Sequence, residues 1–391
     1  MKWFSMKILR ILLRTLVLIP LAAIVYFVIL VIRLLHPISS HTDFKQTKPY
    51  KWNKVQLGRN TVSGDGSGYH MYSKRGGSNN LIIYFSGGGM AWDARSAFSP
   101  TGITSLVKKN SFGYYFNNIP MYILVSLHGI FDNKKAENPF RGWNIVYIPY
   151  STGDMHIGNS ITAYTHKGRI KEIHHNGKYN TLACLDWIYE SFENPDKIMV
   201  CGDSAGAFAA PYWVNTIAGH YRDSRIFCLS DGAHLRSRNW PAIIDGIWKC
   251  EFEDTFGYKP TDDPLAEAFI NTADNNILIM HTNTLYDRTL ASYQADINNE
   301  PKGRTEYIHR WSKDMLNTVS RLTKSTPNYH FYLTKYGYYR FRYSTPHTLT
   351  RYPRFYKANE GGISFTKWLD DIINRGNSYD VGADYLAKPE I

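Results

Sequence analysis

The stretch KIMVCGDSAGAFAA (197–210) decides the fold of this chain. An apolar run leads into GDSAG (202–206), and a run of small and apolar residues with helical character follows. This strand–turn–helix order around G-x-S-x-G is typical of a nucleophile elbow, which exposes its serine on a strained turn. The alternative is a serine that caps the helix of an ordinary βα unit. We predict that Ser204 is a nucleophile and that the tight turn requires Gly202 and Gly206.

Short apolar runs recur on both sides of this stretch, and helical stretches separate several of them. They are LIIYF (81–85), NIVYIPY (144–150), KIMVCG (197–202), IFCLSDG (226–232), NILIMHTN (276–283) and YHFYLT (329–334). Continuous Ile, Val, Leu and Phe content suits strands that are buried on both faces. Strand–helix alternation then predicts an α/β fold of the α/β-hydrolase type, with a mostly parallel central sheet and helices on both faces. Residues 94–143 are irregular, and we expect cap-like loops there.

A second motif follows the run at 81–85, namely SGGGMAW (86–92). Consecutive glycines let backbone N–H groups approach a substrate carbonyl without obstruction by side chains. In this fold one oxyanion donor comes from such a loop and the other from the residue after the nucleophile. The predicted oxyanion hole is therefore formed by Gly88, Gly89 and Ala205. A phosphate-binding loop is the competing interpretation, but the sequence lacks the G-x-G-x-x-G spacing and a following Lys-Ser/Thr.

The acid and the base should follow the nucleophile in the order Ser, Asp or Glu, His. His347 lies in a proline-bearing loop beyond the last apolar run, so it is the predicted base. Asp287 follows the run at 276–283 and is the predicted acid, and Asp231, one strand earlier, is its rival. A solvent-exposed loop residue is the alternative reading of His347. Three further residues are less suitable candidates because they lie within or before a strand: Asp274, His309 and His330.

The amino-terminal segment contains an uncharged apolar run, TLVLIPLAAIVYFVILVI (15–32), bracketed by Arg14 and Arg33. Its length nearly spans the hydrocarbon layer of a bilayer. More positive charge precedes the run than follows it, so the rest of the chain should lie on the extracytoplasmic side. A cleaved signal peptide is the alternative. We expect a membrane anchor at 1–35, a linker at 36–60 and the α/β-hydrolase domain at 61–391.

Composition excludes several other classes of protein. The net charge is +12, but the positive residues are scattered, and no basic run interleaved with aromatic residues suggests nucleic-acid binding. The four cysteines form no CxxC pair. His156, His174 and His175 lack the spacing of metal ligands, so we expect neither a metal nor a cofactor.

With these residues in place, the sequence resembles the pectin acetylesterase family, which includes the Notum carboxylesterases. Three blocks in the order of the family carry the resemblance: GGGMAW (87–92), the segment from GIFDN (129–133) to YIPYSTGD (147–154), and GDSAG (202–206). The resemblance implies hydrolysis of a carboxylic ester by Ser204, Asp287 and His347. Plant members tend to carry cysteines at the positions of Asp203 and Thr348, so pectin itself is not implied as the substrate.

These observations predict a serine carboxylesterase that removes short acyl groups, acetyl foremost, from an acylated carbohydrate. Two alternatives stay open. One is an esterase for lipids or a protein deacylase, which would need a deeper apolar pocket. The other is a catalytically silent hydrolase fold that binds a glycan or a protein partner.

Overall fold

The computed structural model describes residues 18–22, 25–26, 38–58, 60–102, 113–272, 277–351 and 353–387. Contacts divide the chain into two units. One comprises 1–38 with 121–126, and the other comprises 39–120 with 127–391. The second unit contains the sheet, most of the helices and all of the predicted site residues.

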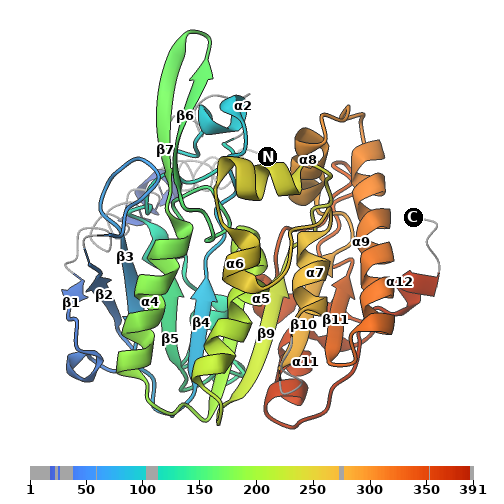
Figure 1. The fold of residues 1–391 in the computed structure, drawn as a ribbon. Coiled ribbons are helices and arrows are strands. Elements are labelled where there is room, and N and C mark those ends of the chain that lie inside the picture. The colour runs from blue at the N-terminus through green and yellow to red at the C-terminus, as the bar shows by residue number, and fades with distance from the viewer. Residues whose placement is uncertain are drawn as a thin grey trace, which may run out of the picture. The chain divides into compact units, whose positions relative to one another are not determined.

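A nine-stranded sheet forms the centre of the second unit (Figure 1). Its strands are β1 (Ser39–Ser40), β2 (Trp52–Gln56), β3 (His70–Lys74), β4 (Leu81–Phe85), β5 (Asn144–Ile148), β8 (Lys197–Asp203), β9 (Arg225–Asp231), β10 (Leu278–Thr284) and β11 (Tyr329–Thr334). The order across the sheet is β1-β2-β3-β5-β4-β8-β9-β10-β11. All pairs from β5 to β11 are parallel, and β3 pairs antiparallel with both β2 and β5. The mostly parallel sheet predicted from the sequence is thus confirmed.

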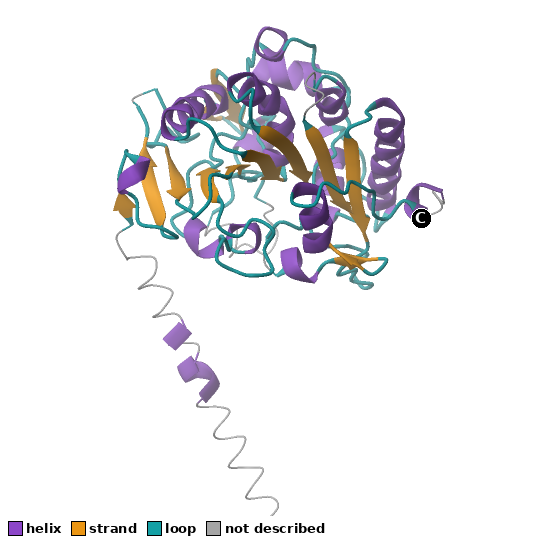
Figure 2. Ribbon diagram, turned by 90° about the horizontal axis from the view of Figure 1, so that it is seen from below, coloured by secondary structure: helices purple, strands orange, loops and turns teal. Residues whose placement is uncertain are grey.

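Helices lie on both sides of the strand layer (Figure 2). The longer ones are α4 (Gly177–Ser191), α5 (Ala205–His220), α7 (Pro264–Ile270), α8 (Arg288–Ile297), α9 (Glu306–Ser325) and α11 (Phe365–Ile373). Short helices are α2 (Ala94–Ala97), α6 (Phe252–Phe256), α10 (Arg354–Lys357), α12 (Asp384–Ala387), the 3₁₀ turns η1 (Phe44–Gln46), η2 (Ile123–Ser126) and η3 (Gly129–Phe131), and the π-helix η4 (Ala242–Ile247). Two small two-stranded sheets complete the list: β6 (Ser160–His166) with β7 (Arg169–His175), and β12 (Asn359–Glu360) with β13 (Ile363–Ser364).

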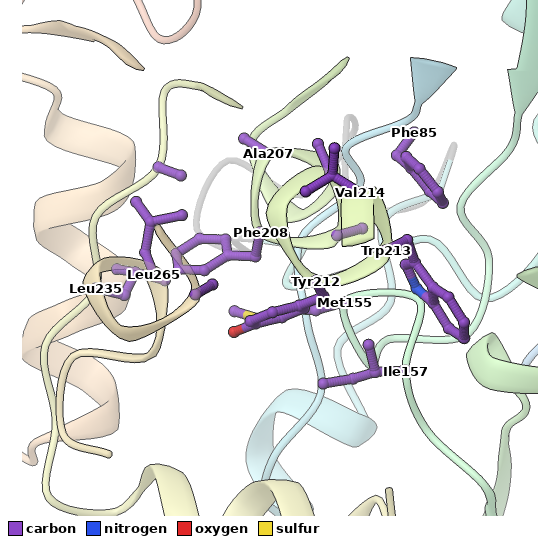
Figure 3. Packing of buried hydrophobic residues seen from close by; sticks show 14 of the residues in the cluster. Phe85, Met155, Ile157, Ala207, Phe208, Tyr212, Trp213, Val214, Leu235 and Leu265 are labelled. Atoms are coloured by element: carbon purple, nitrogen blue, oxygen red, sulfur yellow. The ribbon is translucent and has the colours of Figure 1, made fainter. Parts of the chain in front are cut away.

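Helix α5 is the element that holds Ser204 against the sheet. It is buried on nearly every face, and it contacts β8 and β9. Figure 3 shows Phe208, Tyr212 and Trp213 projecting from α5 in different directions into the surrounding apolar side chains. Burial of a large aromatic side chain stabilises a fold by about 2–3 kcal/mol. The turn before α5 is therefore supported from below by a rigid, well-packed helix.

The structure differs from the sequence-based expectation in the segment at 36–60. Part of this predicted linker joins the sheet, as β1 and β2. The sequence does not reveal β2 because it contains Asn53, a polar residue that is typical of loops. In the structure this residue is fully buried. Its side chain bonds the backbone of His41 and the hydroxyl of Ser73. A polar residue of this kind fits a sheet when such partners satisfy it.

The predicted anchor at 15–32 lies largely outside the described residues. Of this run, only 18–22 and 25–26 are described; both pieces are helical and exposed. Within the described part of the chain, no helix is both long enough and apolar enough to cross a membrane. The transmembrane helix therefore stays a prediction.

Candidate active site

The turn between β8 and α5 has the geometry of a nucleophile elbow. Ser204 has φ 55° and ψ −121°, a strained conformation for a residue with a side chain. A Cβ at Gly202 would lie 2.2 Å from the carbonyl oxygen of Gly206, and one at Gly206 would lie 2.0 Å from that of Phe85. Only glycine fits these two positions. The amide of Ser204 donates to the carbonyl of Asp231 at 2.9 Å, which ties the elbow to the end of β9.

The predicted base and acid are in direct contact. Nδ1 of His347 lies 2.5 Å from Oδ2 of Asp287. The Asp287 side chain is 1% exposed and that of His347 is 22% exposed, so the pair is shielded yet reachable. The opposite ring nitrogen, Nε2 of His347, is buried and has no hydrogen-bond partner in the described part of the chain. This nitrogen is therefore available to accept a proton.

A second set of hydrogen bonds holds the Asp287 side chain in place. It is the N-cap of α8, and its Oδ1 accepts hydrogen bonds from the amides of Thr289 and Leu290 at 2.9 and 3.1 Å. The two carboxylate oxygens thus serve different partners, because Oδ1 caps the helix and Oδ2 faces His347. Such capping fixes the carboxylate relative to the carboxyl end of β10.

The rival acid, Asp231, is used differently. Its carboxylate accepts hydrogen bonds from the amides of Leu349 and Thr350 and from the hydroxyls of Thr282 and Thr350, at 2.7 to 2.9 Å. Burial nevertheless raises the pKa of Asp231 above its ordinary value, although these hydrogen bonds oppose the rise. Asp231 therefore fastens the loop that carries His347 to the end of β9, and it makes no hydrogen bond to the imidazole.

The surroundings of His347 shift its pKa upward relative to a free imidazole. Burial alone would lower the pKa of His347, but the carboxylate of Asp287, with smaller contributions from Asp203 and Asp231, raises it above its ordinary value of 6.5. A carboxylate beside Nδ1 also fixes the tautomer that leaves Nε2 unprotonated. The arrangement suits a base that takes a proton and holds the resulting positive charge.

The glycine loop after β4 lies directly against the elbow. A Cβ at Gly87 would lie 2.8 Å from Cβ of Ser204, so this position admits no side chain. Within the described residues, the amides of Gly88 and Gly89 donate to no acceptor. The amide of Ala205 lies in the first turn of α5, where helix N–H groups have no intrahelical partner. These three amides, at the predicted positions, are free to bind an oxyanion.

One buried carboxylate that the sequence analysis did not single out joins these loops. Asp203 accepts a hydrogen bond from the amide of Gly87 at 2.9 Å and is paired with Arg351, whose Nε and Nη2 lie 2.9 and 3.2 Å from its two oxygens. Burial would raise the pKa of Asp203, but Arg351 holds it below its ordinary value. The position x of G-x-S-x-G marks Asp203 in the sequence; nothing in the sequence marks Arg351 as its partner.

Four other histidines that the structure describes have structural contacts. Nε2 of His156 lies 2.9 Å from the carbonyl of Ser86, and Nδ1 of His175 lies 2.8 Å from that of Thr152. His330 pairs with Asp380, and His309 packs on Tyr343. In the regions that the structure describes, no group of three or more His, Cys, Asp or Glu side chains could hold a metal ion. The four cysteines are free and buried.

Comparison with known proteins gives the family. The pectinacetylesterase family model matches residues 45–239, which include the glycine loop and the elbow. Over these residues the chain belongs to the pectinacetylesterase family. The match places the protein among ester hydrolases. No curated protein matches the sequence in a direct comparison.

Comparison with solved structures supports the assignment of the fold. Two crystal forms of the Wnt deacylase Notum from Drosophila align with TM-scores of 0.54. The sequence identities are 15% and 14%, and the alignments cover 84% of this chain and 96% and 97% of the Notum chains. The pectinacetylesterase-family chain therefore has a Notum-like α/β-hydrolase fold.

Proposed function

We propose that this protein is a serine carboxylesterase in which Ser204, His347 and Asp287 form the catalytic triad. The observation that carries the proposal is the contact of 2.5 Å between Nδ1 of His347 and Oδ2 of Asp287, which leaves Nε2 without a partner in the described part of the chain. This pair follows β10 and β11 at the edge of the sheet where the elbow follows β8.

In the proposed reaction, Nε2 of His347 removes the proton of Ser204 Oγ as the oxygen attacks the ester carbonyl. The resulting oxyanion is bound by the amides of Gly88 or Gly89 and Ala205, and one such donor is worth about 3 kcal/mol of transition-state stabilisation. The protonated imidazole then gives its proton to the departing alcohol, and an acyl-enzyme remains. Water, activated by the same imidazole, releases the acid and restores Ser204.

The substrate we propose is an acylated carbohydrate that carries short acyl groups, acetyl foremost. Support comes from the family match, because pectinacetylesterases are named for the removal of acetyl groups from a glycan. The net charge of +12 favours an anionic polymer. A protein deacylase is the second candidate, since the structural neighbour Notum is described as a Wnt deacylase.

A series of p-nitrophenyl esters from acetyl to decanoyl separates these candidates. A shallow site gives the highest kcat/KM for acetyl or propionyl, whereas a deep apolar pocket gains about 0.8 kcal/mol of binding for each buried methylene. A steady rise of kcat/KM towards octanoyl would replace the acetylesterase proposal by the lipid or protein deacylase. The matched control is Ser204→Ala. If the wild type turns over no ester faster than this variant does, the fold is a silent binding module.

We also propose that the run at 15–32 anchors the chain in a membrane, with the hydrolase domain on the extracytoplasmic side. The charge asymmetry around the run supports this orientation. Such an anchor would hold the active site within reach of envelope polymers.

A further inference from the structure

One cavity of this unit is lined by none of the proposed catalytic residues. It has a volume of about 490 Å³ and is lined by Tyr50, Lys74, Asp132, Asn133, Lys134 and Lys135. Lys74, the last residue of β3, pairs with Ile145 near the amino end of β5. The triad candidates follow the carboxyl ends of the parallel strands, so the backbone of Lys74 lies toward the opposite edge of the sheet. Part of the cavity wall, 132–135, belongs to the family-like block whose role the catalytic residues do not explain.

The charge balance of this cavity is unusual. Three lysines line it against one carboxylate, that of Asp132. Lys74 is only 8% exposed, whereas Lys134 and Lys135 are exposed. A buried ammonium group normally has a carboxylate partner, because burial of an uncompensated charge costs several kcal/mol.

Lys74 has no such partner among the described residues. Its Nζ donates one hydrogen bond, to the carbonyl of Phe131 at 2.6 Å, and lies 4.6 Å from the ring centroid of Trp52. An ammonium group has three donors, so this bond leaves donor capacity unused. Burial lowers the pKa of Lys74 to about 8; Asp132 opposes this effect and Lys134 adds to it.

Among the described residues, Asp132 forms no direct ion pair with any of the three lysines, and its carboxylate oxygens contact other groups. Oδ2 accepts the amide of Gly129 at 2.8 Å and the hydroxyl of Tyr356 at 3.4 Å, and Oδ1 lies 3.3 Å from Nδ1 of His128. Aromatic rings face the other two lysines, with Nζ of Lys134 4.8 Å from the centroid of Tyr50 and Nζ of Lys135 3.7 Å from that of Tyr356.

We propose that this cavity binds an oxyanion, either a free phosphate ion or the carboxylate of an acidic sugar. The ligand would complete the coordination of Lys74 and draw Lys134 and Lys135 inward as charge partners. The volume exceeds that of a single small ion and lies within the range of cavities that hold small organic ligands. The site does not depend on the proposed esterase activity, because no triad candidate lines it.

The test is isothermal titration calorimetry of the full chain with inorganic phosphate and with a uronic acid oligosaccharide. We expect binding of at least one of them, and a loss of affinity of tenfold or more in Lys74→Met. Lys134→Gln combined with Lys135→Gln should also weaken binding. Both side chains are exposed, so this second variant keeps the test valid if Lys74→Met does not fold. Lys51→Gln, an exposed lysine outside the cavity lining, is the matched control.

The pH dependence gives a second readout. Lys74 is charged below its pKa of about 8, and anion affinity should therefore fall as the pH rises from 7 to 9.5. The other groups that face the cavity are Asp132, Lys134, Lys135 and the Tyr50 hydroxyl, and Lys74→Met isolates the share of Lys74 because this variant retains all of them. Phosphate binding alone identifies a site for the free ion, and tighter binding of the oligosaccharide identifies an acidic polymer.

Two results would overturn the inference: no binding of either ligand, or equal affinities for wild type, Lys74→Met and the double lysine variant. Ser204→Ala should bind the anion as the wild type does. A wild type that binds the anion but turns over no ester faster than Ser204→Ala would contradict the proposed function alone, and a wild type that turns over ester but binds no anion would contradict this proposal alone.

Discussion

We predict that the substitution Asp287→Asn removes catalysis while it retains most of the local structure. In the wild type, Oδ1 of Asp287 caps α8 and Oδ2 accepts from Nδ1 of His347. Asparagine keeps one carbonyl oxygen for the cap and presents an NH₂ group to the imidazole. That donor stabilises the tautomer with the proton on Nε2, which cannot then accept the proton of Ser204 Oγ.

The magnitude follows from the loss of the correct tautomer. The same change in a serine protease triad lowers kcat about 10⁴-fold, and this corresponds to about 5 kcal/mol in the activation barrier. Because asparagine is as good an N-cap as aspartate, the free energy of unfolding should change by less than about 1 kcal/mol. Asp287→Ala removes the cap as well, so it should cost about 1 kcal/mol of stability in addition to activity.

The assay combines p-nitrophenyl acetate turnover with thermal melting, and Asp231→Asn is the comparison. Asp231 accepts hydrogen bonds from four groups, of which three lie in the loop that carries His347 and one, the Thr282 hydroxyl, lies in β10. Its amide variant should therefore lose about 2–4 kcal/mol of stability. The fraction that stays folded should keep the His347 tautomer and most of its turnover. The reasoning fails if Asp287→Asn retains turnover within tenfold of wild type, or if Asp231→Asn alone is inactive when folded.

Four further predictions rest on charged residues. The imidazole of His347 must be neutral to act as a base, so kcat/KM should fall with decreasing pH at a midpoint above 6.5, and Asp287→Asn should move the midpoint lower; a midpoint unchanged by the variant contradicts the pairing. The same pair stabilises the fold fully below pH 6.5, and this contribution should disappear as the pH rises through the raised pKa of His347, as melting at several pH values would show. Arg351→Met leaves the Asp203 carboxylate buried and unpaired, which should cost about 3–5 kcal/mol of unfolding free energy. Adding Asp203→Asn should recover part of the loss, and a wild-type melting temperature in Arg351→Met would exclude a stabilising ion pair. Reporter fusions after residue 60 should be active only on the extracytoplasmic side, and an active cytoplasmic reporter would contradict the proposed topology.

The sequence predicted the centre of the fold well because the central strands are buried on both faces. Runs such as LIIYF (81–85) and YHFYLT (329–334) correspond residue for residue to β4 and β11. The outlying strands were harder to predict from the sequence. Strand β2 alternates buried and partly exposed positions and includes the buried Asn53, and the exposed outer face of the β6–β7 hairpin carries Ile161 and Ile170. Tertiary partners decide such segments, and a single sequence does not show them.

The candidate site also has a part that the sequence predicted and a part that it did not. Ser204, Asp287 and His347 each follow a strong strand signal, so their order along the chain predicted a shared edge of the sheet. The partners of these residues are not local, because Asp203 and Arg351 are 148 positions apart in the sequence. The sequence likewise does not distinguish Lys74 from the other lysines. Only the folded chain shows that its side chain is buried, with 8% exposed.

The position of Asp203 explains how the glycine loop, the nucleophile elbow and the His347 loop, which are far apart in the sequence, keep a fixed arrangement. Its carboxylate is bonded to Gly87 in the glycine loop and to Arg351 beyond the His347 loop, while its own backbone leads into Ser204. Asp231, at the end of the neighbouring strand, has a similar role. Its backbone carbonyl accepts a hydrogen bond from the amide of Ser204, and its carboxylate accepts hydrogen bonds from the amides of Leu349 and Thr350. Two buried aspartates at the ends of adjacent strands, β8 and β9, therefore connect the elbow to both of the loops on which the proposed chemistry depends. Burial makes each connection costly to break, because an unpaired carboxylate would remain in the interior. The strain stored at Ser204 is supported by these bonds rather than by the turn itself.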